Sequence, residues 1–95
     1  VDLRKKSNTF GLVFKRIINS KNHNAILIPR GFAHGVLAIE NNTIIINFCS
    51  NIYNPKKEFG VNIKSLNLKI PSMKLIISSK DKKLPNLKDV IKKIK

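Results

Sequence analysis

The segment with the most distinctive chemistry is residues 28–35, which read IPRGFAHG. Pro29 fixes one backbone angle, whereas Gly31 and Gly35 allow backbone angles that other residues avoid. His34 lies between the two glycines, so the pattern predicts a shaped turn that presents an imidazole. An imidazole in such a turn can bind a ligand or move a proton, and a structural hydrogen bond by the same side chain is the alternative.

A metal centre is not expected in this chain. Its only other histidine is His23, which lies in a polar stretch, and the sequence has no His-x-His pair. Zinc or iron needs three or more convergent ligands, which these residues do not easily supply. We therefore expect His34 to act without a metal or another cofactor.

The formal net charge of +14 raises the question of a nucleic-acid partner. Almost all of the excess is lysine, which is scattered along the chain, and no recognised nucleic-acid motif is present. We therefore expect no nucleic-acid binding, although a basic nucleic-acid binder is kept as a rival function. A positive field would still draw in a small anionic ligand.

The rest of the chain must supply the elements that hold the turn. Short segments rich in β-branched and aromatic residues recur between turn-forming residues, with no helical pattern between them. This spacing predicts an all-β fold, an antiparallel β-sandwich or barrel. Asn41 and Asn42 are expected to form a turn, because asparagine tolerates the left-handed backbone region. The predicted strands are residues 1–4, 12–18, 25–28, 36–39 and 43–49.

One short helix is expected near the C-terminus. Apolar residues recur there at helical spacing, and lysines occupy the opposite face. Asn86 is placed to cap this helix, and Asp89 falls in its first turn. The helix is expected to pack its apolar stripe against the sheet rather than to bind a membrane or a partner. The stripe consists of Leu84, Leu87, Val90, Ile91 and Ile94.

The length of the chain and its single cysteine limit the number of domains and the disulfides that it can have. Ninety-five residues allow a single small domain. The one cysteine, Cys49, excludes a disulfide framework and fits a reducing cytoplasm. No apolar run reaches transmembrane length. The chain does not begin with methionine, and residue 1 reads as the middle of a strand, so we expect it to be part of a longer protein.

Five short motifs together carry a resemblance to a known family. They are VDLR at residues 1–4, SNTFG at 7–11, PRGFAH at 29–34, YNP at 53–55 and SKD at 79–81. With them the chain resembles the C-terminal half of the dTDP-4-dehydrorhamnose 3,5-epimerases, a family of isomerases with a cupin jelly-roll fold. The resemblance implies a metal-independent homodimer that epimerises dTDP-4-keto-6-deoxyglucose in dTDP-rhamnose or related deoxysugar synthesis. The N-terminal half of the family is not in these 95 residues.

The resemblance also implies roles for individual residues. His34 would hydrogen-bond the sugar nucleotide, and Tyr53 would stack on the thymine ring. Glu58 and Lys80 match positions that contact the ligand. Asp81 would orient the catalytic base histidine, but that histidine belongs to an Arg-Gly-Leu-His segment that this chain lacks.

Asn47 is the main departure from the family pattern. It occupies the position of the tyrosine that serves as general acid, and an amide has no proton to donate near neutral pH. The alternatives are therefore a related 3-epimerase or ketoisomerase, or a catalytically inactive sugar-nucleotide-binding protein. If the strands alternate as expected, the side chains of Asn47, His34 and Tyr53 face one cavity.

Overall fold

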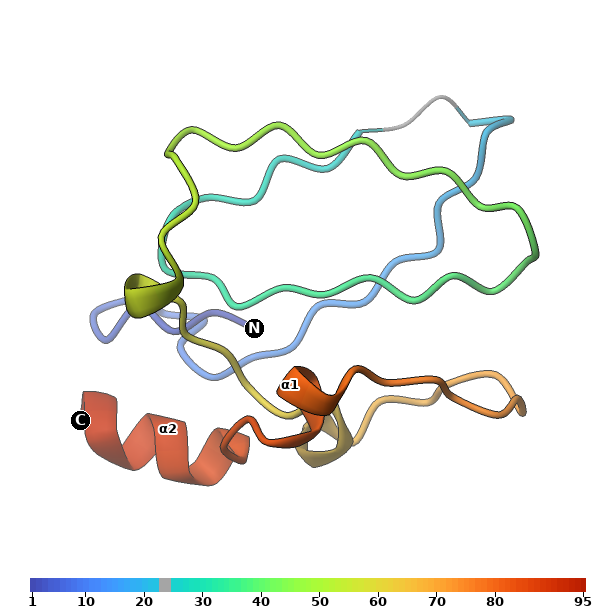
Figure 1. The fold of residues 1–95 in the computed structure, drawn as a ribbon. Coiled ribbons are helices and arrows are strands. Elements are labelled where there is room, and N and C mark those ends of the chain that lie inside the picture. The colour runs from blue at the N-terminus through green and yellow to red at the C-terminus, as the bar shows by residue number, and fades with distance from the viewer. Residues whose placement is uncertain (23–24) are drawn as a thin grey trace.

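The helical elements lie in the C-terminal half of the chain, in a computed structural model that describes residues 1–22 and 25–95 (Figure 1). Two are 3₁₀ helices, η1 (Pro55–Lys57) and η2 (Ile63–Leu66). Two are α-helices, α1 (Ser79–Lys82) and α2 (Leu87–Ile94). In Figure 1, η2, α1 and α2 lie in the lower part of the molecule, whereas η1 lies higher, at its left-hand side.

Side-chain caps explain where the three shorter helices begin. The Asn54 side chain accepts a hydrogen bond from the backbone N–H of Lys56 at the start of η1. Asn62 does the same for η2, and the Ser78 hydroxyl accepts from the N–H of Asp81 in α1. Such caps satisfy donors that have no partner inside the helix, so each element starts directly after its capping residue.

Helix α2 lies where the helical spacing predicts it. Val90 is completely buried, and α2 packs against η2. The Ser65 hydroxyl accepts a hydrogen bond from the backbone N–H of Leu87 at 2.9 Å, which ties the two helices together. Asn86 occupies the N-cap position, but its side chain makes no capping hydrogen bond. Residues outside the apolar stripe, Lys88, Lys92 and Lys93, are exposed.

The prediction of an all-β cupin jelly roll or antiparallel sandwich is wrong. Within residues 1–22 and 25–95 the structure has no β-strand, and the one β-pairing is an isolated antiparallel bridge between Asp2 and Phe32. The predicted strands at 12–18, 36–39 and 43–49 run as unpaired stretches (Figure 1). The described part of the chain is therefore mostly irregular, with short helices.

The physical reason is that β-propensity measures how a side chain fits a half-buried, pleated surface beside a neighbouring strand. Residues 43–49 have the right composition but no such surface. Ile44, Ile46 and Phe48 are 86%, 76% and 96% exposed, and Ile45, on the opposite side of an alternating chain, is 46% exposed. Neither face is fully covered, so the side chains that favour a strand gain little burial.

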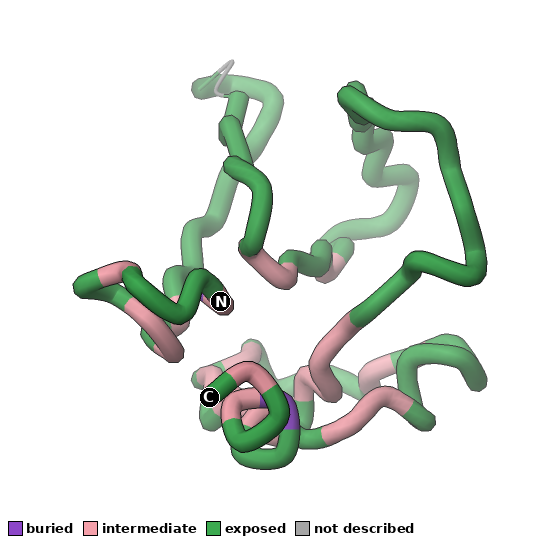
Figure 2. Tube along the Cα trace, turned by 90° about the vertical axis from the view of Figure 1, so that its left-hand side faces the viewer, coloured by how far each residue is buried: buried purple, intermediate pink, exposed green. Residues whose placement is uncertain are grey.

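The total accessible surface area also shows that little of the chain is buried. It amounts to 8948 Å², whereas a folded monomer of this mass exposes about 5500 Å². Figure 2 shows that the upper stretches are almost entirely exposed and that burial gathers around α2 and the N-terminal segment. The core is therefore small.

One local prediction can be checked directly. The Asn41–Asn42 turn is confirmed, since Asn42 has a φ of 61° in the left-handed region. No helix in the described ranges is both long enough and apolar enough to cross a membrane.

Candidate functional site

The turn at residues 28–35, here called the His34 loop, is held by the N-terminal segment. The backbone N–H of Leu3 donates to the carbonyl of Gly31 at 2.9 Å. The N–H of Ala33 donates to the carbonyl of Val1 at 3.0 Å, and the Val1 amino group donates to the Ala33 carbonyl at 2.8 Å. These bonds fix the loop backbone immediately before His34, whose side chain is exposed.

The two loop glycines have different conformations. Gly31 has a φ of +86°, which is unfavourable for residues with a side chain, so this position needs glycine. Gly35 does not have a positive φ, and no atom would contact a Cβ added there within 4 Å. The sequence prediction that both glycines provide special angles is therefore correct for Gly31 alone.

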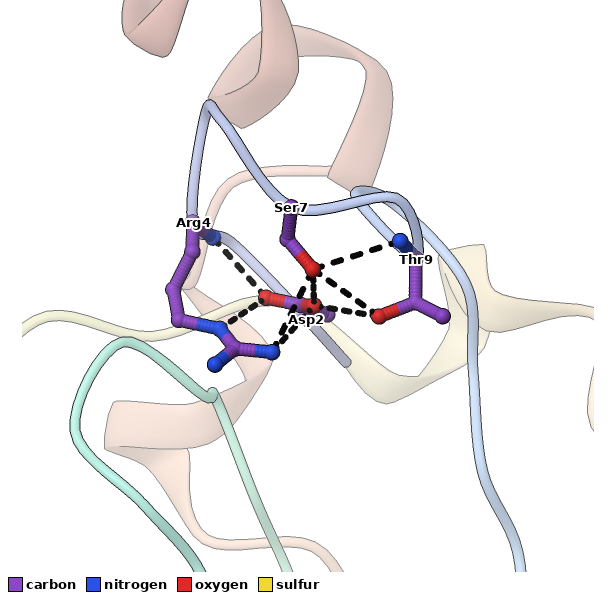
Figure 3. Close-up of polar contacts among 4 residues, drawn as sticks. All are labelled: Asp2, Arg4, Ser7 and Thr9. Carbon is purple, nitrogen blue, oxygen red and sulfur yellow. Dashed lines mark hydrogen bonds and ion pairs between the residues drawn. The ribbon is translucent and has the colours of Figure 1, made fainter.

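A polar cluster, here called the Asp2 cluster, lies beside the loop and consists of Asp2, Arg4, Ser7 and Thr9 (Figure 3). The Asp2 side chain is 2% exposed. Its carboxylate accepts from Arg4 Nε at 2.9 Å and from Arg4 Nη2 at 2.9 Å. The hydroxyls of Ser7 and Thr9 donate to the same carboxylate at 2.5 and 2.6 Å. All of its oxygens therefore have partners, as a buried charge requires.

This arrangement favours the ionised carboxylate strongly. The Arg4 guanidinium holds the pKa of Asp2 well below its usual range, and the hydroxyl donors act in the same direction, although burial opposes them. The same contact raises the pKa of Arg4. Asp2 and Arg4 are thus a permanent ion pair at neutral pH, which suits a structural function better than proton transfer.

An open hollow of about 720 Å³ lies at the end of the long unpaired stretches. Tyr53 and Glu58 line it together, and the Tyr53 ring is 68% exposed. Lys80 forms an ion pair with Glu58 from the first turn of α1, 22 residues further along the chain. The complete lining is Ser50, Asn51, Ile52, Tyr53, Asn54, Lys57 and Glu58.

The chemistry of this hollow suits a flat, anionic ligand. An exposed tyrosine ring offers a face for stacking on a base. Lys57 in the lining and Lys80 beside Glu58 offer cations for phosphate oxygens. Asp81 follows Lys80 directly on α1, with its backbone N–H donated to Ser78 and its side chain exposed. The structure thus brings Tyr53, Glu58 and Lys80 together, with Asp81 beside them in sequence.

His34 and Asn47 do not join this group. The lining of the Tyr53 hollow contains neither residue, so the prediction that they face the same cavity as Tyr53 is not met in the described structure. Asn47 is exposed within the unpaired stretch at 43–49, because there is no strand pairing to aim its side chain. A second hollow of about 430 Å³ lies against the His34 loop and is lined by Leu3, Gly31, Phe32, Ala33, Lys57, Phe59 and Ile94.

The described residues provide no place where three or more His, Cys, Asp or Glu side chains converge. His23, the second histidine of the sequence, lies outside the described residues.

The Asp2 cluster is the part of the site that reasoning about single functional residues missed. The motifs VDLR and SNTFG carried the family resemblance, but no role was predicted for their side chains. An acid and an arginine two positions apart share one side of an extended chain, and Ser and Thr favour local turns, so a local ion pair was readable there. The cluster also contacts the loop, because the Arg4 guanidinium lies over the Phe32 ring. That contact was not readable from the sequence, because the two residues are 28 positions apart.

The comparison with known families decides the identity of the chain. A family model described as dTDP-4-dehydrorhamnose 3,5-epimerase matches residues 1–89, nearly the full length. The chain belongs to the dTDP-4-dehydrorhamnose 3,5-epimerase family. The matched range contains all five motifs named above, together with the Asp2 cluster, the His34 loop and the Tyr53 hollow.

Three relatives, each named dTDP-4-dehydrorhamnose 3,5-epimerase, illustrate the similarity. The Escherichia coli K12 protein is 30% identical over 95 residues, which cover 97% of this chain and 51% of the relative. The Shigella flexneri protein is 32% identical over 83 residues, covering 85% of this chain and 46% of the relative. The Methanothermobacter thermautotrophicus protein is 38% identical over 61 residues, covering 64% and 33%.

The chain spans about half the length of the relatives that match most of its own length. The similarity falls on the C-terminal portion of the family, as the motifs predicted. No solved structure matches the chain.

Proposed function

We propose that this chain provides the sugar-nucleotide-binding part of a dTDP-4-dehydrorhamnose 3,5-epimerase. The substrate is a dTDP-linked 4-keto-6-deoxy sugar, and the product belongs to dTDP-rhamnose or related deoxysugar synthesis. The observation that carries the proposal is the family match over residues 1–89, which includes a hollow lined by Tyr53 and Glu58 with Lys80 paired to Glu58. Tyr53 stacks on the thymine ring, and the lysines contact the diphosphate.

The reaction removes a proton next to the keto group and returns it on the opposite face. This requires a base, an acid and stabilisation of the enolate oxygen. In the proposal His34 hydrogen-bonds the ligand, and Asp81 orients a base histidine from a segment that these 95 residues do not contain. Asn47 donates an amide hydrogen bond to the developing oxyanion, since it cannot donate a proton.

Solvent-deuterium incorporation into dTDP-4-keto-6-deoxyglucose tests this function. We would compare the 95-residue chain, the same chain joined to the upstream half of the Escherichia coli relative, and the joined chain with Asn47→Tyr. We expect no incorporation by the first, slow incorporation by the second, and incorporation faster by about 10²-fold or more by the third, because general acid catalysis contributes at least that much. Turnover by the 95-residue chain alone would overturn the assignment of the base, and an unchanged rate with Asn47→Tyr would overturn the assignment of the acid.

A second candidate is a sugar-nucleotide-binding protein without turnover, which Asn47 favours. It predicts that dTDP binds to the joined chain but that no deuterium enters the sugar, even with Asn47→Tyr. A 3-epimerase or ketoisomerase would instead label a single carbon or move the keto group, and NMR of the product distinguishes both.

Three further parts of the proposal concern partners and location. We infer a homodimer, which analytical ultracentrifugation across a wide concentration range would test. We infer no nucleic-acid partner, and salt-dependent binding to DNA of any sequence would contradict this. We infer a cytoplasmic location, because the lone Cys49 fits a reducing compartment.

A further inference from the structure

Arg4 contacts the His34 loop at two successive residues. A Cβ built on Gly31 would lie 2.5 Å from Cγ of Arg4, so the aliphatic part of the arginine passes directly over the glycine backbone. The guanidinium carbon lies 4.5 Å from the centre of the Phe32 ring, within the range of a cation–π contact. One side chain therefore covers the centre of the loop.

The orientation of Arg4 is fixed from its other side. Two parallel hydrogen bonds to Asp2 hold the edge of the guanidinium, and Nη2 also lies 3.3 Å from the Ser7 hydroxyl. The Asp2 carboxylate is itself held by hydroxyls of the same cluster and by the backbone N–H of Arg4 at 3.0 Å (Figure 3). A guanidinium can bond a carboxylate through two parallel N–H groups while its flat face stacks on a ring, a geometry that an ammonium lacks.

Backbone hydrogen bonds hold the same part of the loop as these side-chain contacts. The Asp2–Phe32 bridge brings the two segments together, and the bonds between Ala33 and Val1 complete it. His34 follows Ala33 directly, so the position of its imidazole depends on how firmly residues 31–33 are held.

We propose that Arg4, clamped by Asp2, is a positioning residue that orders the loop at residues 31–33 and thereby places His34 for the ligand. The ordering of the loop stands on the contacts above. Its consequence for ligand binding rests on the proposed function.

The test is NMR on the ¹⁵N-labelled 95-residue chain with Arg4→Lys. The matched control is Arg16→Lys, the same change at an exposed arginine in the stretch at 12–18. We expect amide exchange at Ala33 to be about tenfold faster in Arg4→Lys, from loss of the stacked and bidentate contacts, and unchanged in Arg16→Lys. The C2–H resonance of His34, assigned with His34→Gln, is expected to shift in Arg4→Lys alone.

Two amides of α2 report whether the variant is still folded. The N–H groups of Asp89 and Val90 both donate to the Asn86 carbonyl at the start of the helix, and their exchange should not change. If Arg4→Lys loses this protection as well, Phe32→Leu replaces it, because that variant removes the ring while leaving the ion pair in place. Faster exchange at Ala33 in Phe32→Leu supports the proposal.

Titration with dTDP separates this proposal from the proposed function. Weaker dTDP binding by Arg4→Lys together with faster exchange at Ala33 supports both. If exchange at Ala33 is faster in Arg4→Lys but the wild-type chain does not bind dTDP, the ordering of the loop is supported and the proposed function is contradicted. Unchanged exchange at Ala33 in a folded Arg4→Lys chain, or a His34 resonance that does not move, overturns the positioning role.

Discussion

Replacing Gly31 with alanine should loosen the His34 loop, whereas the same change at Gly35 should not. Gly31 has a φ of +86°, and an alanine in the left-handed region costs about 1 kcal/mol or more. The new Cβ would also lie 2.5 Å from Cγ of Arg4, so the arginine must move away. Losing its contact with the Phe32 ring adds about 1 kcal/mol.

The combined cost is about 2 kcal/mol, which corresponds to a roughly 30-fold increase in local opening. Native-state amide exchange measures it at two protected positions. Leu3 donates to Gly31 and Ala33 donates to Val1, and both bonds must break when the loop opens. We therefore expect both amides to exchange roughly 30-fold faster in Gly31→Ala.

Gly35→Ala is the matched control for this prediction. No atom lies within 4 Å of the added Cβ, and the backbone at Gly35 does not have a positive φ. Alanine there should leave exchange at Leu3 and Ala33 unchanged or make it slightly slower, because it restricts the unfolded chain. Equal effects of the two substitutions would refute the reasoning, since Gly31 has the left-handed backbone and the Arg4 contact and Gly35 has neither.

Two further predictions concern stability. Val90→Ala removes two buried methyl groups and should lower the free energy of unfolding, measured by urea denaturation, by about 2 kcal/mol. Ile76→Ala is the control and should have little effect, because Ile76 is 95% exposed. The pKa of Asp2 is lowered in the folded chain, so in acid the unfolded chain binds more protons than the folded chain. The stability that ionised Asp2 contributes should therefore be fully present above about pH 4 and should fall as the pH drops below that value. Urea midpoints measured across this pH range should fall with pH in the wild type and should not fall in Asp2→Asn. An identical pH dependence in Asp2→Asn would contradict the assignment.

Local patterns in the sequence predicted local structure well. The apolar spacing that includes Val90 predicts α2, because residues three and four apart share a helix face whatever surrounds them. Asn42 predicts its turn because the left-handed conformation is a property of that residue and its neighbours. Gly31 is similar, although Gly35, which looks equivalent in the sequence, has an ordinary backbone.

Non-local structure was not predictable in the same way. Ile44 and Phe48 have strand-forming side chains, yet a strand depends on a partner that no local pattern specifies. The same limit applies to the site. The pairing of Glu58 with Lys80 joins positions 22 residues apart, and the contact of Arg4 with Phe32 joins positions 28 apart. The resemblance to the epimerase family suggested the first pair as ligand contacts, but neither contact follows from composition or spacing.

Titration of the 95-residue chain with dTDP, followed by NMR, tests the central claim most directly. The account predicts saturable shifts of the Tyr53 ring and of Lys80 and its neighbours on α1, and loss of saturation in Tyr53→Ala, because stacking on an exposed ring carries the binding. Shifts that spread over the lysines of the whole chain, persist in Tyr53→Ala and disappear with added salt would contradict it.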